Sequence, residues 1–244
     1  MKKDVLSELP EKVETVQYVT MDEAQRKLYL AHVYELKEVI ESSSNRDKLE
    51  ILSMLTRLRQ LCCDPGLFIE NYDGGSCKME EIERMLEELT ESGHNVLVFS
   101  QFTSMLSRIR QMLDDKKIGY FLLQGDTPRE ERAELVKRFN AGEAPVFLIS
   151  LKAGGTGLNL TRADTVIHVD PWWNIAAQNQ ATDRCYRIGQ KRKVQVYQLI
   201  AKDTIEENIL KLQSQKRALA ESVTEEADGG IMSMSKEDLI KLLD

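Results

Sequence analysis

The spacing of hydrophobic residues divides the chain into two regions. From Asp22 to about Ile40 apolar residues recur at helical intervals, and the helical pattern continues through residues 49–61 until Pro65-Gly66 stops it. Beyond this region short continuous apolar runs alternate with amphipathic segments. The segment between the two, residues 70–76 with the sequence ENYDGGS, is rich in glycine and turn-forming residues. A domain boundary is therefore predicted there.

Six segments have the pattern of β-strands. Residues 12–20 alternate in polarity, and the other five segments are short apolar runs separated by amphipathic helices. These five runs are residues 95–100, 119–125, 145–150, 164–170 and 194–201. Repeated strand–helix–strand units imply a parallel sheet with helices on both faces, so the predicted fold class is α/β with three layers.

Three domains follow from these patterns. Residues 1–76 are predicted to form a strand plus a helical segment. Residues 77–222 are predicted to form the α/β domain together with a packed C-terminal helix. Residues 223–244 form an acidic tail in which Ser235 to Asp238 has the sequence of a helix start, which predicts a short helix.

The composition is that of an ordinary globular protein: 244 residues, of which 42% are apolar and 30% charged. The formal charge of -7 argues against a generally basic nucleic-acid coat, so any site for a polyanion must be local. The four cysteines show no C-x2-C pairing and no histidine at zinc spacing. Neither a disulfide framework nor a metal site is predicted.

No apolar run approaches the roughly 20 residues that span a bilayer, and the first twelve residues lack the apolar core of a signal peptide. No membrane partner is expected. The expected location is the cytoplasm in a prokaryote or the nucleus in a eukaryote.

Parallel sheets bind their ligands at the carboxyl ends of their strands. Four segments follow predicted strands directly and should share that edge of the sheet. They are residues 100–102, 124–126, 150–157 and 170–174.

The segment SLKAGGTGLNLT, residues 150–161, has three glycines in four positions after a buried strand. Glycines there let the backbone approach a ligand and leave amide groups free to bind an anion. The segment is not a Walker A loop, because G-x-x-x-x-G-K-[S/T] occurs nowhere in the chain. A tight turn before the next strand is the alternative.

The segment DPWWN, Asp170 to Asn174, places both tryptophans of the chain directly after a strand. A tryptophan at such an edge can cap the core, or it can offer a flat surface to a base or sugar. Asn174 is well placed to cap the following helix.

That helix is predicted to contain Gln180, Asp183, Arg184 and Arg187, and the intervals of three and four residues bring Gln180 and both arginines close to one face. Guanidinium groups match the geometry of phosphate, and arginines that reach a transferring phosphoryl group are known as arginine fingers. The next cations, Lys191 to Lys193, lie beyond the helix. They are expected to contact DNA, another domain or only water.

Four segments together resemble a known family. VLVFSQFTSML, LLQGDTPREER, LISLKAGGTGLNLTRADTVIHVDPWWN and QATDRCYRIGQKRKVQVYQLI resemble, in order, the motifs of the second RecA-like lobe of Swi/Snf-type DNA translocases, helicase-like ATPases of superfamily two. The resemblance covers about Lys78 to Glu221. Residues 10–68 are similar to the helical protrusion that precedes this lobe, and residues 202–216 are similar to the helix packed behind it.

The resemblance implies a site for ATP between two lobes. The N-terminal RecA-like lobe supplies the phosphate loop and the acidic pair that binds Mg²⁺. Arg184 and Arg187 reach across to the gamma phosphate, with Gln180 alongside. Gly157 and Asp183 lie on the nucleotide side, and Gly157 links the ATP cleft to a groove for double-stranded DNA. The residues implied at that groove are Ser100, Gln101, Phe102, Lys152, Gly154, Gly155, Thr156, Trp173 and Asn174.

The chain departs from the family pattern at two places. Ile175 stands where a proline is common, and Cys185-Tyr186 stands where alanine-histidine is common, which puts the usual role of the histidine in doubt at Tyr186. Neither Walker A nor a D-E-x-H box occurs. The chain is therefore expected to be the C-terminal piece of a longer protein and to be inactive alone as an ATP hydrolase.

Two alternatives remain open beside the motor lobe. One is a non-catalytic scaffold that binds DNA or protein, and the other is the lobe of an RNA helicase of the same superfamily. For the translocase, the expected partners are double-stranded DNA, the N-terminal lobe and a DNA-bound protein as a candidate remodelling target.

Overall fold

The structure is a computed structural model and describes residues 9–42, 48–154, 157–220 and 234–244. The chain divides into two compact units. The first, called the sheet unit, consists of the residues up to Gln17 with Glu80–Asp170 and Ala176–Leu199. The second, called the helical unit, consists of Tyr18–Met79, Pro171–Ile175 and Ile200–Asp244.

Six strands form one sheet in the order β1-β6-β5-β2-β4-β3. They are β1 (Lys12–Val19), β2 (Val96–Ser100), β3 (Tyr120–Leu123), β4 (Val146–Ser150), β5 (Thr165–His168) and β6 (Val194–Ala201). β2 to β6 pair in parallel. The Glu11 and Val19 carbonyls accept hydrogen bonds from Val194 and Lys202 at a constant offset, so β1 is parallel too. The predicted parallel sheet is confirmed.

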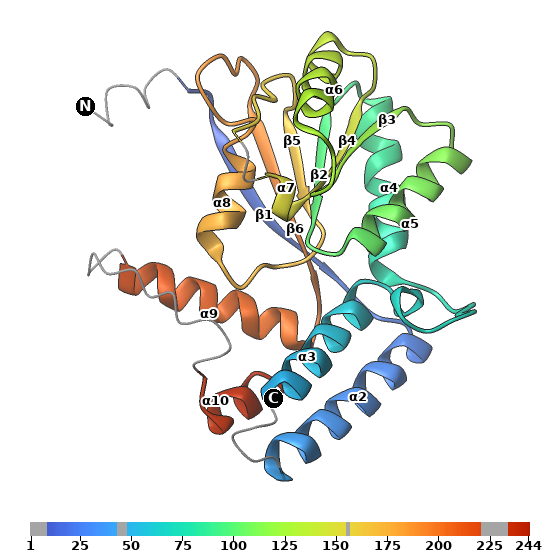
Figure 1. Cartoon of the computed structure of the whole chain (residues 1–244), viewed down its shortest axis with the longest axis vertical. Coiled ribbons are helices and arrows are strands. Elements are labelled where there is room, and N and C mark those ends of the chain that lie inside the picture. The colour runs from blue at the N-terminus through green and yellow to red at the C-terminus, as the bar shows by residue number, and fades with distance from the viewer. Residues whose placement is uncertain (1–8, 43–47, 155–156, 221–233) are drawn as a thin grey trace. The chain divides into compact units, whose positions relative to one another are not determined.

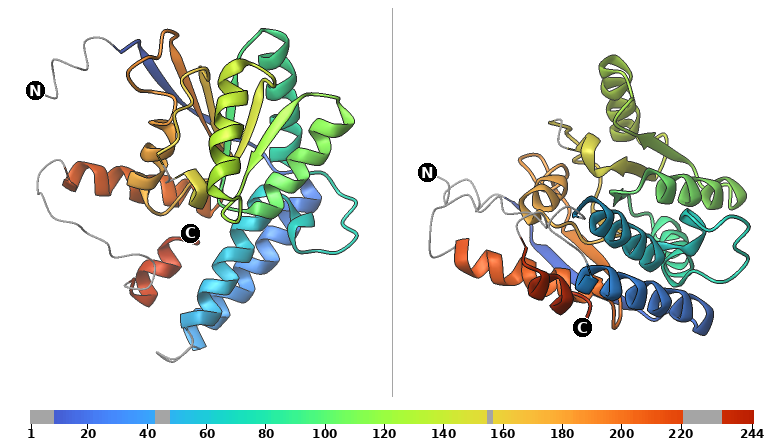
Figure 2. Two further views of the ribbon diagram at one scale, coloured as in Figure 1. Left: turned by 45° about the horizontal axis from the view of Figure 1, so that its top comes forward. Right: turned by 60° about the horizontal axis from the view of Figure 1, so that its bottom comes forward.

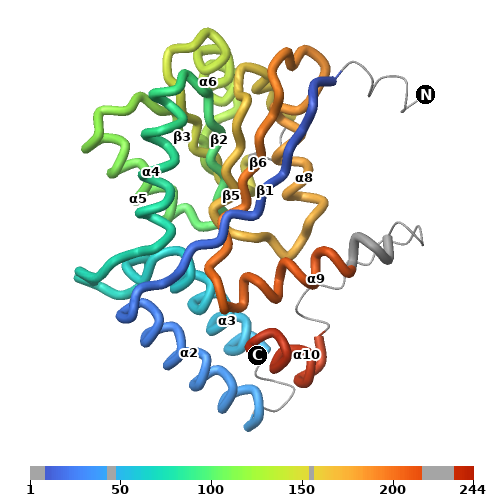
Figure 3. Tube along the Cα trace, turned by 180° about the vertical axis from the view of Figure 1, so that it is seen from behind, coloured from blue at the N-terminus to red at the C-terminus, as the bar shows by residue number. Residues whose placement is uncertain are grey.

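Helices cover both faces of this sheet. They are α4 (Cys77–Glu91), α5 (Thr103–Asp115), α6 (Arg129–Ala141), α7 (Leu151–Gly154) and α8 (Ile175–Thr182). α6, α7 and α8 lie on the face toward the viewer in Figure 1, and α4 and α5 lie on the opposite face, which is in front in Figure 3. Every residue of β2, β4 and β5 is buried, as expected for strands covered on both sides. The predicted three-layer α/β arrangement is confirmed.

Glycine sets the end of α6, whose C-cap residue is Gly142. Gly142 has a φ of 89°, in the left-handed region, and its N–H bonds back to the last turn of the helix. A Cβ added at this position would lie 2.5 Å from the Arg162 guanidinium group. Any other residue there would therefore have a strained backbone, and the Arg162 side chain would have to move aside.

The helical unit has its own core. Its elements are α2 (Glu23–Ser42), α3 (Lys48–Cys63), the 3-10 helix η1 (Pro65–Leu67), α9 (Ile205–Ala220) and α10 (Lys236–Lys241). α2 and α3 lie side by side as an antiparallel pair (Figure 2). Their inward residues pack with α9 and α10 around Leu36, Leu58 and Ile209. None of the four cysteines, all of which lie among the described residues, forms a disulfide, and three of them are buried.

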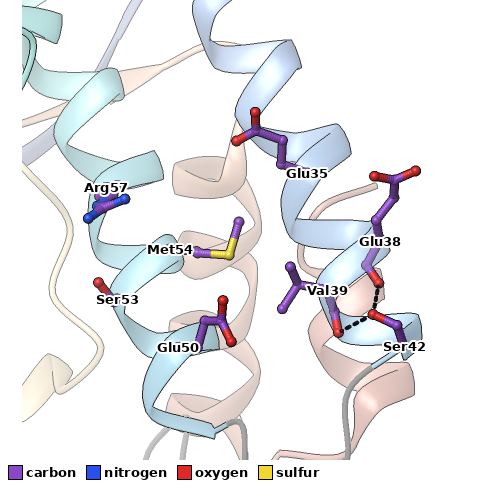
Figure 4. Close-up of a pocket in the computed structure, with 8 residues that line it drawn as sticks. All are labelled: Glu35, Glu38, Val39, Ser42, Glu50, Ser53, Met54 and Arg57. Atoms are coloured by element: carbon purple, nitrogen blue, oxygen red, sulfur yellow. Dashed lines mark hydrogen bonds between the residues drawn. The ribbon is translucent and has the colours of Figure 1, made fainter.

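α2 and α3 also border an open groove of about 660 Å³, shown in Figure 4. Carboxylates of Glu35, Glu38 and Glu50 line it, together with Met54 and Arg57. Among the described residues, no helix is both long enough and apolar enough to cross a membrane.

The compact units divide the chain differently from the predicted domains 1–76, 77–222 and 223–244, which stay predictions. β1 lies in the sheet beside β6, although it comes before the predicted boundary at 76. In the predicted tail, α10 begins after Ser235, whose hydroxyl accepts the N–H of Asp238. Its Leu239 is buried in the core of the helical unit.

Candidate functional site

The two predicted arginine fingers lie in a turn and not on a helix. α8 ends at Thr182, and residues 183–187, called the arginine turn, follow it as consecutive turns and bends. The prediction that one helix carries Gln180, Asp183, Arg184 and Arg187 is therefore wrong. Only Gln180 belongs to α8.

The backbone hydrogen bonds show where the helix ends. The N–H groups of Arg184 and Cys185 bond to carbonyls three residues back instead of four, so the α-helical ladder gives way to turns after Thr182. Groups outside α8 then hold the turn. The carbonyl of Arg184 accepts the N–H of Leu160 at 2.9 Å, and the carbonyl of Cys185 accepts the side-chain amide of Gln190 at 3.2 Å.

The Arg184 side chain is 9% exposed and is held against the end of α8. Its Nε donates a hydrogen bond to the Gln180 carbonyl oxygen at 3.0 Å. Burial lowers the pKa of Arg184, the positive charge of Arg187 lowers it further, and Asp183 opposes both effects. An arginine nevertheless stays protonated in proteins, so two cations are held close together here.

Arg187 is exposed and contacts the glycine segment. Its Nη1 donates to the Leu158 carbonyl oxygen at 3.4 Å, directly after Gly157, which is exposed and has a φ of 59°. With the Leu160 N–H bonded to Arg184, the segment 157–160 is attached to the arginine turn at two points. The structure thus holds the segment that begins at Gly157 against the arginine turn.

Neither Arg184 nor Arg187 forms an ion pair with a carboxylate among the described residues. Asp183 and the Gln180 side chain are exposed at the same place. Two adjacent cations without an anion favour a negatively charged ligand, because the ligand would offset their mutual repulsion. The arginine turn can therefore bind an anionic group such as phosphate.

A second cluster lies where β2 and β5 end. The buried carboxylate of Asp170 accepts the Ser100 hydroxyl at 2.5 Å, the Gln101 side-chain amide at 2.6 Å and the Gln101 N–H at 3.3 Å. The Ser100 oxygen in turn accepts the N–H of Phe102 at 3.1 Å. Ser100 and Phe102 are buried, so Gln101 is the member of this predicted trio with a partly exposed side chain.

The glycine-rich segment 150–161 is described except for residues 155 and 156. Lys152 is exposed on α7, and Gly154 is the last residue of that helix. The predicted DNA contacts Gly155 and Thr156 lie outside the described residues. Beyond them, a groove of about 680 Å³ separates residues 157–159 from α6 and is lined by Arg129, Arg132 and Val136.

In the helical unit the tryptophan segment is fixed by α3 and α9. Trp173 packs partly buried against the core, and the Arg59 guanidinium group lies 5.2 Å from the centre of its ring. Arg59 also donates to the Pro171 carbonyl oxygen at 2.5 Å, and Gln213 donates to the Trp172 carbonyl oxygen. Asn174 is exposed directly before α8. These contacts favour the core-cap interpretation for Trp173.

The basic strip, Lys191 to Lys193, is largely neutralised within the chain. Arg192 Nη1 lies 2.7 Å from the buried carboxylate of Asp164, and Lys193 Nζ lies 2.8 Å from Glu11. Lys191 is exposed and has no side-chain partner among the described residues. Two of the three cations are therefore paired within the chain, Arg192 with a buried carboxylate and Lys193 with an exposed one.

Sequence reasoning missed the residues that support these groups. Asp170 contacts Gln101, which is 69 residues away along the chain, and Arg59 contacts Pro171, which is 112 residues away. Thr182 and His168 lie beneath the arginine turn, and a buried histidine at the end of an apolar strand was the signal available in the sequence. Among the described residues no group of three or more side chains could hold a metal ion.

Comparisons with known protein families agree with the motif order. Residues 77–189 match the helicase conserved C-terminal domain, and residues 1–67 match the SNF2-related domain. The putative ATP-dependent helicase/translocase YwqA of Bacillus subtilis is 36% identical over 247 residues, which cover 98% of this chain and 27% of that protein. The chain spans about a quarter of the length of the curated relatives it matches.

Two solved structures are similar along nearly the whole chain. The Sulfolobus solfataricus SWI2/SNF2 ATPase core in complex with dsDNA is 34% identical with a TM-score of 0.82, covering 99% of this chain and 52% of that one. The C-terminal domain of the same ATPase is 31% identical with a TM-score of 0.79, covering 96% of this chain and 99% of that one. The sheet unit therefore has the predicted RecA-like fold. With its motifs in order and its whole length matched, the chain belongs to the SWI2/SNF2 family of ATP-dependent helicases and translocases, as the C-terminal helicase lobe.

Proposed function

We propose that this chain is the second motor lobe of an ATP-dependent double-stranded DNA translocase. ATP and Mg²⁺ are held mainly by an N-terminal RecA-like lobe, and Arg184 and Arg187 reach the gamma phosphate from this chain. When ATP draws the lobes together, the guanidinium groups stabilise the charge on the transferring phosphoryl group. Release of the products then lets this lobe move along the DNA backbone.

One observation carries the proposal: the arginine turn holds two cations side by side without a carboxylate partner among the described residues. In a protein of net charge -7, such an arrangement suits an anion that arrives from outside the chain. Gly157, beside Arg187, leaves room for the nucleotide, and Gln180 and Asp183 border the same turn.

The DNA groove is proposed along Ser100, Gln101 and Phe102, with Lys152 to Thr156 and the pair Trp173-Asn174. Of this pair Asn174 is exposed, and Trp173, which packs partly against the core, would offer only its exposed part to DNA. Gln101 and Lys152 offer partly or fully exposed polar groups for the phosphate backbone. The presence of double-stranded DNA with the Sulfolobus relative supports DNA as the polymer. Binding is expected to be electrostatic, so the affinity should fall steeply with salt. A DNA-bound protein is the proposed remodelling target.

Arg187→Ala tests the proposal in the protein that joins this chain to its ATP-binding lobe. Loss of an arginine finger is expected to lower DNA-stimulated ATP hydrolysis about 10³- to 10⁵-fold, while DNA binding is retained. Arg110→Ala is the matched control, because Arg110 is an exposed arginine on α5, on the opposite face of the sheet. Near-normal turnover in Arg187→Ala would contradict the assignment.

The chain by itself is expected to be inactive as an ATP hydrolase. The measurement is phosphate release by the purified chain with double-stranded DNA, with and without an added ATP-binding lobe. Turnover by the chain alone that survives in Arg187→Ala would show a contaminating activity, whereas turnover that Arg187→Ala removes would contradict the expected need for a first lobe.

A further inference from the structure

His168 is a buried imidazole directly beneath the arginine turn. It is the last residue of β5 and is 1% exposed. Phe99 is its register partner on β2, and the two rings stack with centroids 5.5 Å apart and an interplanar angle of 22°. Burial and the stacked Phe99 ring therefore fix the orientation of the imidazole ring.

Among the residues that the structure describes, the imidazole makes one hydrogen bond, to Thr182. Its Nε2 lies 3.0 Å from the Thr182 hydroxyl oxygen, and that hydroxyl donates its proton to the Gln178 carbonyl oxygen at 3.4 Å. With the hydroxyl proton on the Gln178 carbonyl, this network corresponds to the neutral tautomer in which Nε2 is the donor. Nδ1 is then a buried acceptor without a hydrogen-bond partner among the described residues.

Thr182 is the residue at which α8 becomes the arginine turn. Its carbonyl oxygen accepts the N–H groups of Cys185 at 3.2 Å and Tyr186 at 3.3 Å, and also the Cys185 thiol at 3.3 Å. The position of Thr182 therefore determines where the backbone of Arg184 to Arg187 begins its turn. A hydrogen bond that fixes the Thr182 side chain fixes this starting point.

We propose that His168 is a positioning residue for the two arginines, acting through its hydrogen bond to Thr182. The proposal rests on the proposed function, because it assumes that Arg184 and Arg187 meet the phosphate. Neutrality is part of the role: burial lowers the pKa of His168 to about 4, so that near neutral pH the ring adds no third positive charge beside the arginine pair. Misplacement of catalytic groups by about 1 Å can cost on the order of 100-fold in rate.

Two pairs of variants separate this role from packing. His168→Leu and Thr182→Val remove the hydrogen bond, whereas His168→Gln and Thr182→Ser keep a donor and an acceptor at the two positions. In the protein that carries both lobes, the first pair is expected to lower kcat for ATP hydrolysis about 10- to 100-fold with little change in KM for ATP. The second pair should retain most of the rate. The double variant His168→Leu/Thr182→Val should be no slower than the slower single variant, because both remove one interaction.

Hydrogen exchange in the chain itself supplies a second readout that needs no activity. The Cys185 and Tyr186 amide hydrogens bond to Thr182 and are expected to exchange at least 10-fold faster in His168→Leu and Thr182→Val, while amides of β2 keep their protection. Equal kcat in His168→Leu and wild type, or unchanged exchange at both amides, would overturn the proposal. If His168→Leu does not fold, Thr182→Val carries the same test.

The two proposals fail in different ways. If Arg187→Ala hydrolyses ATP normally, the arginine-finger function fails, and faster exchange in Thr182→Val would still show that the hydrogen bond holds the turn. If Arg187→Ala is inactive but Thr182→Val hydrolyses ATP at the normal rate, the positioning role alone fails.

Discussion

The ammonium group of Lys78 lies 2.7 Å from a carboxylate oxygen of Glu206, and neither side chain has any exposed surface. The same ammonium group lies 2.8 Å from the other Glu206 carboxylate oxygen, and Glu206 also accepts the N–H of Ala201 at 2.9 Å. The pair joins the start of α4 to the start of α9 and to the end of β6, all within the helical unit. Removing one partner of such a buried ion pair destabilises the protein, because the other charge stays buried without its counter-charge to offset the cost of desolvation.

Lys78→Met is therefore expected to lower the free energy of unfolding by about 3–5 kcal/mol, since it takes the ammonium group away from a fully buried carboxylate. Urea denaturation of the chain measures the change. The double variant Lys78→Met/Glu206→Gln should recover part of the loss, because the amide oxygen can still accept the Ala201 N–H. Lys27→Met is the control: its pair with Glu23 is exposed and should contribute little. Equal effects of the two lysine substitutions would contradict this account of the buried pair.

The buried His168 makes stability depend on pH. Burial lowers its pKa from the ordinary 6.5 to about 4, and Glu14 opposes this effect. Between these values the unfolded chain binds a proton that the folded chain does not, so stability falls as pH falls. Above about pH 7.5 both states are nearly fully neutral at this residue, and its contribution is constant. From pH 7.5 to pH 5 the expected loss from this group is about 2 kcal/mol in the free energy of unfolding.

The measurement is urea denaturation of the wild type and His168→Gln at several pH values from 8 to 4.5. Other groups titrate in both proteins, so the difference between the two curves isolates the histidine. That difference should be flat above pH 7 and should move in favour of His168→Gln as the pH falls. Parallel curves would show that the folded protein binds the proton at His168 as readily as the unfolded chain does.

Asp170 is expected to hold Ser100 and Gln101 in place at the sheet edge where the DNA groove is proposed. Asp170→Asn replaces one acceptor oxygen by a donor, which must then face either Ser100 or Gln101. The expected loss is about 1–3 kcal/mol in the free energy of unfolding, with weaker DNA binding because Gln101 loses its fixed orientation. Asp126→Asn is the matched control, since Asp126 is an exposed aspartate after β3. Equal DNA affinity for Asp170→Asn and the wild type would show that DNA binding does not depend on the contacts of Asp170.

The sheet could be predicted from the sequence because its strands are short apolar runs of uniform length. Burial on both faces gives runs such as residues 96–99 and 146–149 their continuous hydrophobic character, and that pattern is local. The same reasoning placed the carboxyl ends of β2 and β5 at one edge, where Ser100 and Asp170 indeed meet.

The conformation of the arginine turn could not be predicted in the same way. Three- and four-residue spacing between Gln180, Arg184 and Arg187 is compatible with a helix, and no local residue stops it before Gly189. The structure instead turns after Thr182, and the bonds that Leu160 and Gln190 make to the Arg184 and Cys185 carbonyls hold this turn. Contacts of this kind depend on the packed fold and leave no periodic signal.

The basic strip yields a last prediction, because its three cations have different surroundings. Arg192 pairs with Asp164, a carboxylate only 3% exposed that also accepts the N–H of Asn95 at 3.1 Å. Arg192→Ala is expected to lower the free energy of unfolding by about 1 kcal/mol, because a nearly buried carboxylate loses its cation. Lys191 has no side-chain partner among the described residues, so Lys191→Ala should leave stability unchanged.

DNA binding should separate the same two variants in the opposite order. If Lys191 contacts a backbone phosphate, its loss reduces the slope of log affinity against log salt by about 1, whereas Arg192→Ala leaves the slope unchanged. Titrations of a fluorescent DNA duplex at several salt concentrations measure both slopes. A smaller slope in Arg192→Ala with no change in Lys191→Ala would mean that Arg192 exchanges Asp164 for phosphate when DNA binds, and that the basic strip is a DNA contact rather than a structural one.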